Sequence, residues 1–70
     1  MKIEIGVMVN GVFIKKNDTV KIRHKGAKNR NGFYVIVTDV DEERIYFIDK
    51  EEEENENCFY WNELDFIELI

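Results

Sequence analysis

Short apolar runs with a period of two restrict the fold of this 70-residue chain more than any other feature of its sequence. In KIEIGVMV, residues 2–9, every second side chain is a branched apolar one, which is typical of a β-strand with one buried face. This pattern puts on one face Ile3, Ile5, Val7 and Val9. No window of eleven or more residues has helical periodicity. The sequence therefore predicts an all-β protein.

Turn residues separate the apolar runs and predict the elements between them. Asn10-Gly11 supplies two residues that tolerate positive φ, as a type I′ turn requires, so residues 1–16 are predicted to form an N-terminal β-hairpin. Further strands are predicted near residues 19–24, 33–40, 44–49, 58–61 and 66–70. NELD, before the last strand, is long enough only for a single 3₁₀ turn, with Asn62 as its capping side chain.

Two strand registers stay open in this scheme. In FYVIV, residues 33–37, all the side chains are apolar, so either alternate set fits a core. The last strand likewise offers two inner faces, formed by Ile67 with Leu69, or by Phe66 with Glu68 and Ile70. The pattern fixes where the strands are, but not which face each presents.

From residue 19 to residue 70, the predicted order of elements resembles the SH3-like small β-barrels. A long loop over residues 24–32 is followed by two meander strands, a further strand, a 3₁₀ turn and a short last strand, and YWNELDFIELI is the most specific part. The resemblance implies a closed sheet over residues 19–70, with the hairpin of residues 1–16 added to it, in a single domain of residues 1–70. It implies no function, because such barrels serve as ribosomal, transcription, chromatin, adaptor and phage proteins.

Residue types that support catalysis or metal binding are scarce. The only His is His24, the only Cys is Cys58, and the chain has neither Ser nor a Gly-rich phosphate loop. Cys58 opens an apolar run, so we expect it to pack as a small apolar side chain. DVDEER begins like a calcium loop, but Arg44 replaces the obligatory Gly and Lys50 the bidentate Glu. We therefore expect no enzymatic activity, no metal site and no cofactor.

Charge is divided unevenly along the chain, whose formal net charge is −5. Residues 1–30 carry eight cationic side chains and two carboxylates, whereas residues 31–70 carry two cationic side chains and thirteen carboxylates. The two poles are predicted to lie apart on the folded domain. Because the Debye length is about 8 Å at physiological salt, a partner at one pole would feel little of the other.

The acidic pole is the predicted site for a partner protein. Its members are Asp49, Glu51, Glu52, Glu53, Glu54 and Glu56, together with Tyr60. Two other interpretations stay open: a solvated loop that keeps a sheet edge from pairing, and an imitation of nucleic-acid phosphates that inhibits a nucleic-acid enzyme. Opposite poles would also support weak head-to-tail self-association.

The basic pole predicts an alternative function, which is nucleic-acid binding. The candidate residues, which would contact phosphates, are Lys21, Arg23, Lys25, Lys28 and Arg30. Two features argue against this function. The stretch has no interleaved aromatic residues on which bases could stack, and RNA-binding small barrels are usually basic overall. Strand alternation would also project Lys21, Arg23 and Lys25 to solvent as ordinary surface charges.

Aromatic residues suggest two further kinds of site, a cage for a methylated cation and a groove for a proline-rich peptide. The rings concerned are Phe33, Tyr34, Tyr46, Phe47, Phe59, Tyr60 and Trp61. A chain of this size must bury most of its large side chains to fold, so we expect packing to use most of these rings. Tyr34 and Tyr60 are the ones expected at the surface.

Taken together, these features predict a small binding protein that docks on a host protein through its acidic pole. The absence of Pro and the abundance of Ile, Lys, Glu and Asn are typical of AT-rich genomes and favour a phage or mobile-element origin. A single Cys, and the absence of a signal-peptide pattern or membrane-spanning run, predict a cytoplasmic location without membrane contact.

Overall fold

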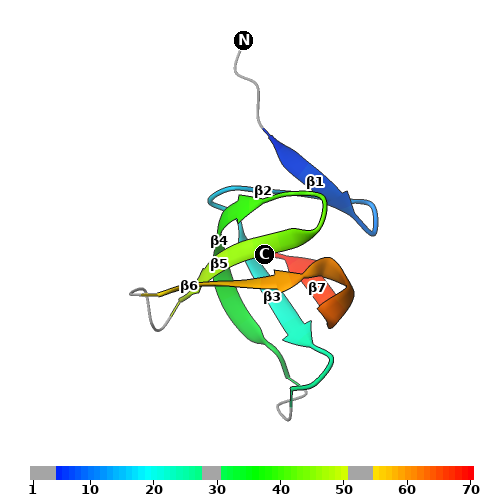
Figure 1. Cartoon of the computed structure of the whole chain (residues 1–70), viewed down its shortest axis with the longest axis vertical. Helices are drawn as coiled ribbons and strands as arrows, with labels where there is room; N and C mark the ends of the chain where they lie inside the picture. The colour runs from blue at the N-terminus through cyan, green and yellow to red at the C-terminus, as the bar shows by residue number, and fades with distance from the viewer. Residues whose placement is uncertain (1–4, 28–30, 51–54) are drawn as a thin grey trace.

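A computed structural model describes residues 5–27, 31–50 and 55–70 of the chain. These residues form seven strands and one 3₁₀ turn, arranged in two antiparallel sheets (Figure 1), so the all-β prediction is confirmed. The elements are β1 (Gly6–Val9), β2 (Val12–Lys15), β3 (Thr19–His24), β4 (Phe33–Val40), β5 (Arg44–Asp49), β6 (Glu56–Tyr60), η1 (Trp61–Glu63) and β7 (Leu64–Leu69).

The smaller sheet is the predicted N-terminal hairpin. Asn10 and Gly11 connect β1 to β2 with φ values of 50° and 82°, the positive pair that a type I′ turn requires. Its inner face packs on the core, where Ile14 is fully buried. Ile5 lies beyond that contact and is 80% exposed, because the hairpin extends past the edge of the larger sheet (Figure 1). The predicted apolar face of the first strand is therefore buried only in part, and Ile3 lies outside the described residues.

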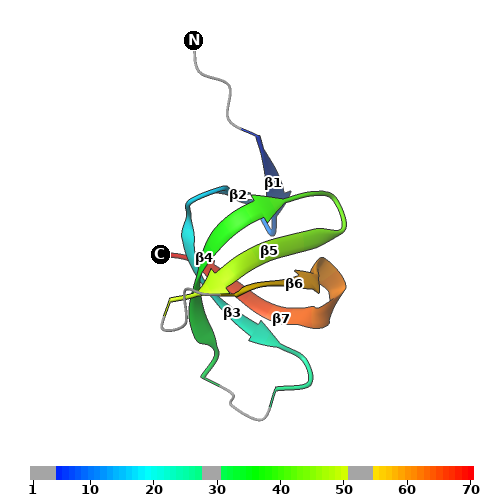
Figure 2. The same ribbon diagram turned by 60° about the vertical axis from the view of Figure 1, so that its left-hand side comes forward.

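The larger sheet has the strand order β6-β5-β4-β3-β7, and Figure 2 shows these strands from a second side. η1 turns the chain from β6 across to the opposite edge, where β7 pairs with β3 and Ile67 lies opposite Ile22. Within the described residues β6 and β7 do not pair with each other, so the sheet is not closed into a barrel. The expectation of a closed sheet is therefore wrong, because in the described part of the chain β6 pairs only with β5 and β7 only with β3.

The elements after β5 differ in their boundaries and cap from the sequence-based prediction. β6 begins at Glu56, two residues early, because the backbone ladder with β5 continues through polar residues whose side chains face solvent. β7 begins at Leu64, directly after η1. The predicted cap Asn62 lies inside η1, and the backbone N–H of Tyr60 donates instead to the Glu63 carboxylate, over 3.0 Å.

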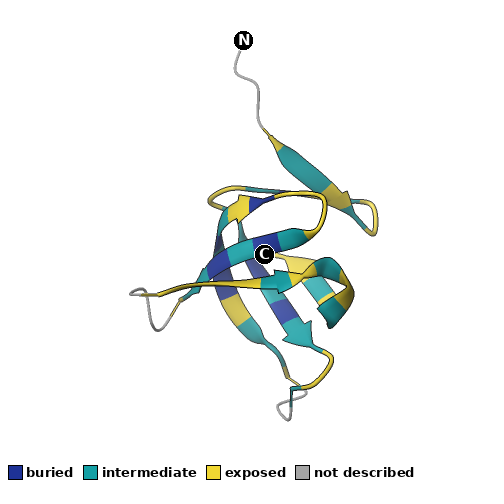
Figure 3. Ribbon diagram, in the orientation of Figure 1, coloured by how far each residue is buried: buried dark blue, intermediate teal, exposed yellow. Residues whose placement is uncertain are grey.

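The core lies between the hairpin and the inner face of the larger sheet (Figure 3). Among the described residues the buried ones are Ile14, Val20, Ile22, Val35, Val37, Val40, Ile45 and Phe47. Val35 lies opposite Val20, which fixes the register of β4 with its valines inward and Tyr34 outward. Complete burial of each such side chain contributes about 1.5–3 kcal/mol to stability.

Candidate binding surfaces

A rigid acidic turn joins β4 to β5. The Asp41 carboxylate accepts hydrogen bonds from the backbone N–H groups of Arg44, at 2.7 Å, and Glu43, at 2.8 Å. These two bonds lower the pKa of Asp41, with the bond from Arg44 the larger cause, because they favour the ionised carboxylate. Asp41, Glu42 and Glu43 are exposed, so this turn presents three acidic residues to solvent.

η1 holds this turn in place through Trp61. The Trp61 backbone N–H donates to the carbonyl of Glu43 over 2.9 Å, and its indole Nε1–H donates to the carbonyl of Asp41 over 2.8 Å. Tyr60, the residue before η1, is 47% exposed, as predicted. We define the docking surface as Asp41, Glu42, Glu43 and Tyr60, which these bonds hold side by side.

The Arg44 side chain lies against two aromatic rings beside the docking surface. Its guanidinium carbon lies 5.3 Å from the ring centroid of Tyr60 and 5.8 Å from that of Tyr46. The pKa of Arg44 is raised, first by Tyr46 and then by Tyr60. The cage considered for a methylated cation is therefore occupied, at these two rings, by a cation of the chain itself. Arg44 Nε is buried without a hydrogen-bond partner among the described residues.

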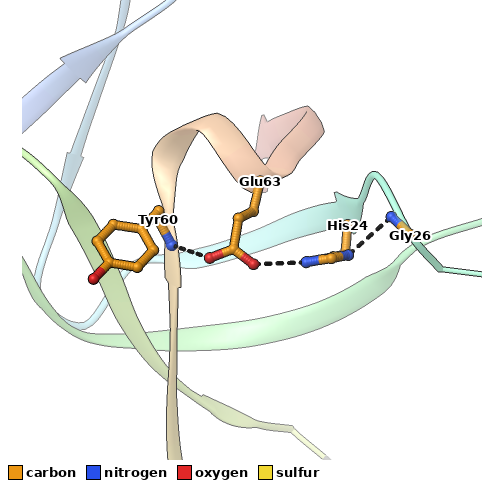
Figure 4. A network of polar contacts seen from close by, with 4 residues as sticks. All are labelled: His24, Gly26, Tyr60 and Glu63. Carbon is orange, nitrogen blue, oxygen red and sulfur yellow. Dashed lines mark hydrogen bonds and ion pairs between the residues drawn. The ribbon is translucent and has the colours of Figure 1, made fainter.

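A polar network ties η1 to the end of β3 (Figure 4). Gly26 N–H donates to Nδ1 of His24 over 2.9 Å, so the ring proton lies on Nε2, which donates to Glu63 Oε2 over 2.9 Å. The other carboxylate oxygen, Oε1, accepts the N–H of Tyr60. These bonds lower the pKa of Glu63, with His24 the larger cause. His24 also packs on Phe59, with ring centroids 4.7 Å apart. His24 thus has a structural role here.

Of the acidic residues predicted to bind a protein together with Tyr60, the structure describes Asp49 and Glu56. Asp49 is half-buried at the end of β5, and Glu56 is exposed at the start of β6, where it accepts a hydrogen bond from Thr38 over 2.6 Å. Tyr60 ends β6, about 14 Å away at 3.4 Å per residue. Glu51, Glu52, Glu53 and Glu54 lie outside the described residues.

The basic residues of β3 are interleaved with side chains from its two neighbours. Lys21 lies over the ring of Tyr34 from β4, 5.6 Å from the centroid, and opposite Glu68 of β7. Lys25 is exposed at the end of the strand, and the predicted residues Lys28 and Arg30 lie outside the described part of the chain. Tyr34 is 48% exposed, as predicted.

Arg23 has acidic and aromatic neighbours on β7. Its Nε donates to Asp65 over 2.6 Å, and its guanidinium lies 5.6 Å from the ring centroid of Phe66. The prediction of separate charge poles is therefore wrong for β3 and β7, because their pairing puts cations and carboxylates side by side. The same pairing supplies aromatic neighbours that the basic stretch lacks in sequence, and no local signal could have predicted them.

Three further features bear on function. A pocket of about 250 Å³ lies between the hairpin tip and the last strand, and it is lined by Val9, Asn10, Trp61, Leu64, Asp65, Phe66 and Ile67. Cys58 is exposed, so the prediction that it packs inside is wrong, because the outer face of the edge strand β6 is open to solvent. Among the described residues there is no group of His, Cys, Asp and Glu that could hold a metal ion.

The helical content in the described ranges is limited to η1, and no helix there is long and apolar enough to cross a membrane. In comparisons with known proteins, no family model, curated protein or solved structure matches this chain. Function therefore has to be inferred from the surfaces themselves.

Proposed function

We propose that this chain is a non-enzymatic binding module of the SH3-like small-barrel type, which docks on a basic segment of a partner protein. Support for the fold type comes from the strand order, in which η1 connects β6 to β7 and β7 returns to pair with β3. Because the two edge strands, β6 and β7, do not pair in the described residues, we regard the fold as a partly open form of such a barrel. As predicted from the sequence, the long connection from β3 to β4 precedes the meander strands β4 and β5.

The observation that carries the docking proposal is the fixed arrangement of the docking surface. Trp61 holds the backbone of the acidic turn through two hydrogen bonds, so this backbone loses little conformational freedom when a partner binds. Tyr60 adds an exposed aromatic ring with a polar tip, the kind of side chain that is enriched at protein interfaces. Arg44 covers part of that ring, which leaves the remainder of Tyr60 for the partner.

A pull-down with matched charge reversals tests this proposal. Tagged protein is incubated with a bacterial lysate at increasing salt. We compare the double variant Glu42→Lys and Glu43→Lys with the double variant Glu52→Lys and Glu53→Lys, which has the same change in net charge. The first pair should abolish retention of the partner and the second should preserve it. Recovery of only RNA or DNA, or equal loss in both variants, would refute docking at this surface.

One observation favours nucleic-acid binding as a second candidate function. On the outer face of the sheet, Tyr34 accompanies Lys21 and Phe66 accompanies Arg23, which is a combination of aromatic faces and cations that single-stranded nucleic acids bind. The ion pair of Arg23 with Asp65, and Glu68 opposite Lys21, reduce the positive potential there. For this reason we rank it second.

Oligonucleotide binding at low salt distinguishes the two functions. Charge reversal at Arg23, Lys25 and Lys28 should abolish retention on heparin or DNA, and Tyr34→Ala should weaken binding to single strands more than to duplexes. Phosphate contacts are strong at about 50 mM salt, so a lack of nucleic-acid binding under these conditions would refute this candidate function.

Two broader parts of the proposal rest on sequence alone. The first is the role of a cytoplasmic accessory protein of phage or mobile-element type, which follows from residue usage. The second is the alternative of a phosphate-mimicking inhibitor, which would use the acidic residues from Asp49 to Glu56 in place of the docking surface. Competition between this protein and DNA for a nucleic-acid enzyme would support that alternative.

A further inference from the structure

β1 has an open edge without the usual protection. Among the described strands it pairs only with β2. Natural edge strands are normally protected by charged side chains, Pro or a bulge, because an open edge can pair with another chain. The stretch Ile5–Val9 contains no charged residue and no Pro, and its pairing with β2 is regular. Such an edge is suited to pairing with another strand.

The backbone groups available at this edge can be identified from Lys15. The Lys15 N–H donates to the Asp18 carboxylate over 3.0 Å, and the Lys15 carbonyl accepts the N–H of Asp18 over 3.2 Å, so both groups point away from β1. Gly6 lies opposite Lys15, and residues opposite each other in an antiparallel ladder exchange both hydrogen bonds or neither. The N–H and C=O of Gly6 therefore point away from β2, and those of Met8 do the same.

The side chains at this edge form an apolar patch on the outer face of the hairpin. Met8 is 63% exposed and lies opposite Phe13, which is 40% exposed. The Phe13 ring covers Gly6, where an added Cβ would lie 2.6 Å from its Cζ. Position 6 thus presents a small residue at the strand edge with an aromatic ring beside it.

We propose that β1 pairs with β1 of a second copy of this chain, antiparallel about a twofold axis at Val7. In this register Gly6 lies opposite Met8 of the partner subunit, and the two exchange both backbone hydrogen bonds, which are the outward-pointing ones. The partner's Met8 then lies over Gly6 and contacts the Phe13 ring, a favourable sulfur–aromatic contact. Ile5 lies opposite Val9 of the partner subunit, which covers its exposed side chain.

A second copy fits this edge because the surface is self-complementary. The pairing sets uncharged residues opposite uncharged residues, whereas a register shifted by one residue would place Met8 opposite Val7 of the partner subunit and leave the outward groups out of phase. The interface is one short strand per copy, so we expect a reversible dimer at high protein concentration. This inference is independent of the proposed function, because β1 and Phe13 lie outside the docking surface.

Measurement of the molecular mass at increasing protein concentration, by light scattering or sedimentation, tests the proposal. The mass of the full chain should rise from that of a monomer to that of a dimer. Met8→Pro removes only an N–H that points outward, so it should raise the dissociation constant by at least about tenfold while the hairpin stays paired. Met8→Lys adds like charges at the edge and should do the same, whereas Met8→Leu should preserve the dimer. Circular dichroism checks that each variant is folded.

Cysteine cross-linking tests the register in a Cys58→Ala background. The two Val7 residues would form a non-hydrogen-bonded pair with Cα atoms about 4.5 Å apart, within the range for a disulfide. Val7→Cys should therefore oxidise to a covalent dimer, and Met8→Cys, although more exposed, should not. Faster cross-linking of the Met8→Cys variant would overturn the register. A mass that stays monomeric, or a dimer unaffected by Met8→Pro and Met8→Lys, would overturn the proposal and leave the edge for a strand of another protein.

Discussion

Two glycines adopt the same left-handed backbone conformation in different surroundings. Gly11, at the hairpin tip, has φ of +82°, and no described atom lies within 4 Å of where its Cβ would be. Gly32, which leads into β4, has φ of +75°, and a Cβ there would lie 2.6 Å from the carbonyl oxygen of Ile22. Both positions require positive φ, but only Gly32 also allows a close approach of the backbone.

Replacement of each glycine by Ala separates these two effects. We expect Gly11→Ala to lower the free energy of unfolding by about 1–2 kcal/mol, the cost of a left-handed conformation for an L-residue. Gly32→Ala should cost clearly more, because β3 must also shift. Urea denaturation of both variants measures the difference. Equal destabilisation would show that the backbone near Ile22 moves freely to accept the methyl group.

Glu63 makes the stability of the domain depend on pH. Its folded-state pKa lies below the ordinary value of 4.5, so the ionised carboxylate stabilises the fold above about pH 4.5, and this stabilisation is lost as the pH falls through the folded pKa. Glu63→Gln should be less stable than the wild type at pH 7, because His24 and Tyr60 donate to different carboxylate oxygens and Gln has an NH2 group, which cannot accept, in place of one of them.

The wild type and the Glu63→Gln variant should become more similar in stability as the pH falls below about 4.5, since the Glu63 carboxyl of the wild type is then protonated and, like the amide, uncharged. Denaturation midpoints at several pH values measure this convergence. Glu68→Gln, a matched change at an exposed position of β7, serves as the control and should run parallel to the wild type. A gap that stays constant down to low pH would mean that the Glu63 charge is not the cause.

At the scale of elements, η1 connects three parts of the molecule. Through Trp61 it holds the turn between β4 and β5, and through Glu63 it contacts both Tyr60 and the end of β3. The backbone N–H of Lys25 also donates to the Glu63 carbonyl over 2.8 Å. A single short turn thus fixes the docking surface and the entry into β7.

Trp61→Phe tests this connection. The variant keeps an aromatic ring but loses the indole N–H that donates to Asp41, so we expect a loss of about 0.5–1.5 kcal/mol in the free energy of unfolding. Amide hydrogen exchange of Glu42 and Glu43 should become faster, while that of β3 should change little. Unchanged exchange in the turn would show that the Asp41 carboxylate alone keeps it rigid.

At the scale of the whole molecule, β7 covers what would otherwise be an open edge of the core. It pairs with β3 along its length, and the backbone N–H of Ile70 donates to the carbonyl of Thr19 over 3.0 Å. Val20 and Ile22 of β3 are fully buried. The first and last strands of the larger sheet therefore depend on each other, although more than forty residues of chain separate Val20 from its opposite residue, Leu69.

Truncation after Asp65 should therefore unfold the entire domain. A chain without residues 66–70 exposes the edge of β3 and part of the core, which a domain of this size has little stability to lose. Circular dichroism and thermal denaturation should show no cooperative transition. Retention of a cooperative transition would mean that β3, β4 and β5 form a stable unit alone. Ile70→Ala, which leaves the backbone bond to Thr19 in place, should still fold.

The sequence by itself determined the elements whose signals are local. Asn10-Gly11 determined the hairpin turn through positive φ, and alternation placed β3, β4 and β5 with their correct boundaries. The register of β4 was not determined, because its apolar residues fit the core on either face until Val20 pairs with Val35. Long-range pairing depends on the sum of many weak contacts between distant residues, which no local pattern contains.

The tertiary structure alone decided the composition of the candidate surfaces. It brought Asp41 beside Tyr60 through Trp61, although the sequence suggested a site around Glu51–Glu54. It also set Arg23 between Asp65 and Phe66, where the sequence showed only a basic stretch. Charge patterning along a chain records neighbours in sequence, whereas a binding surface is made of neighbours in space, and these coincide only within a strand or a turn.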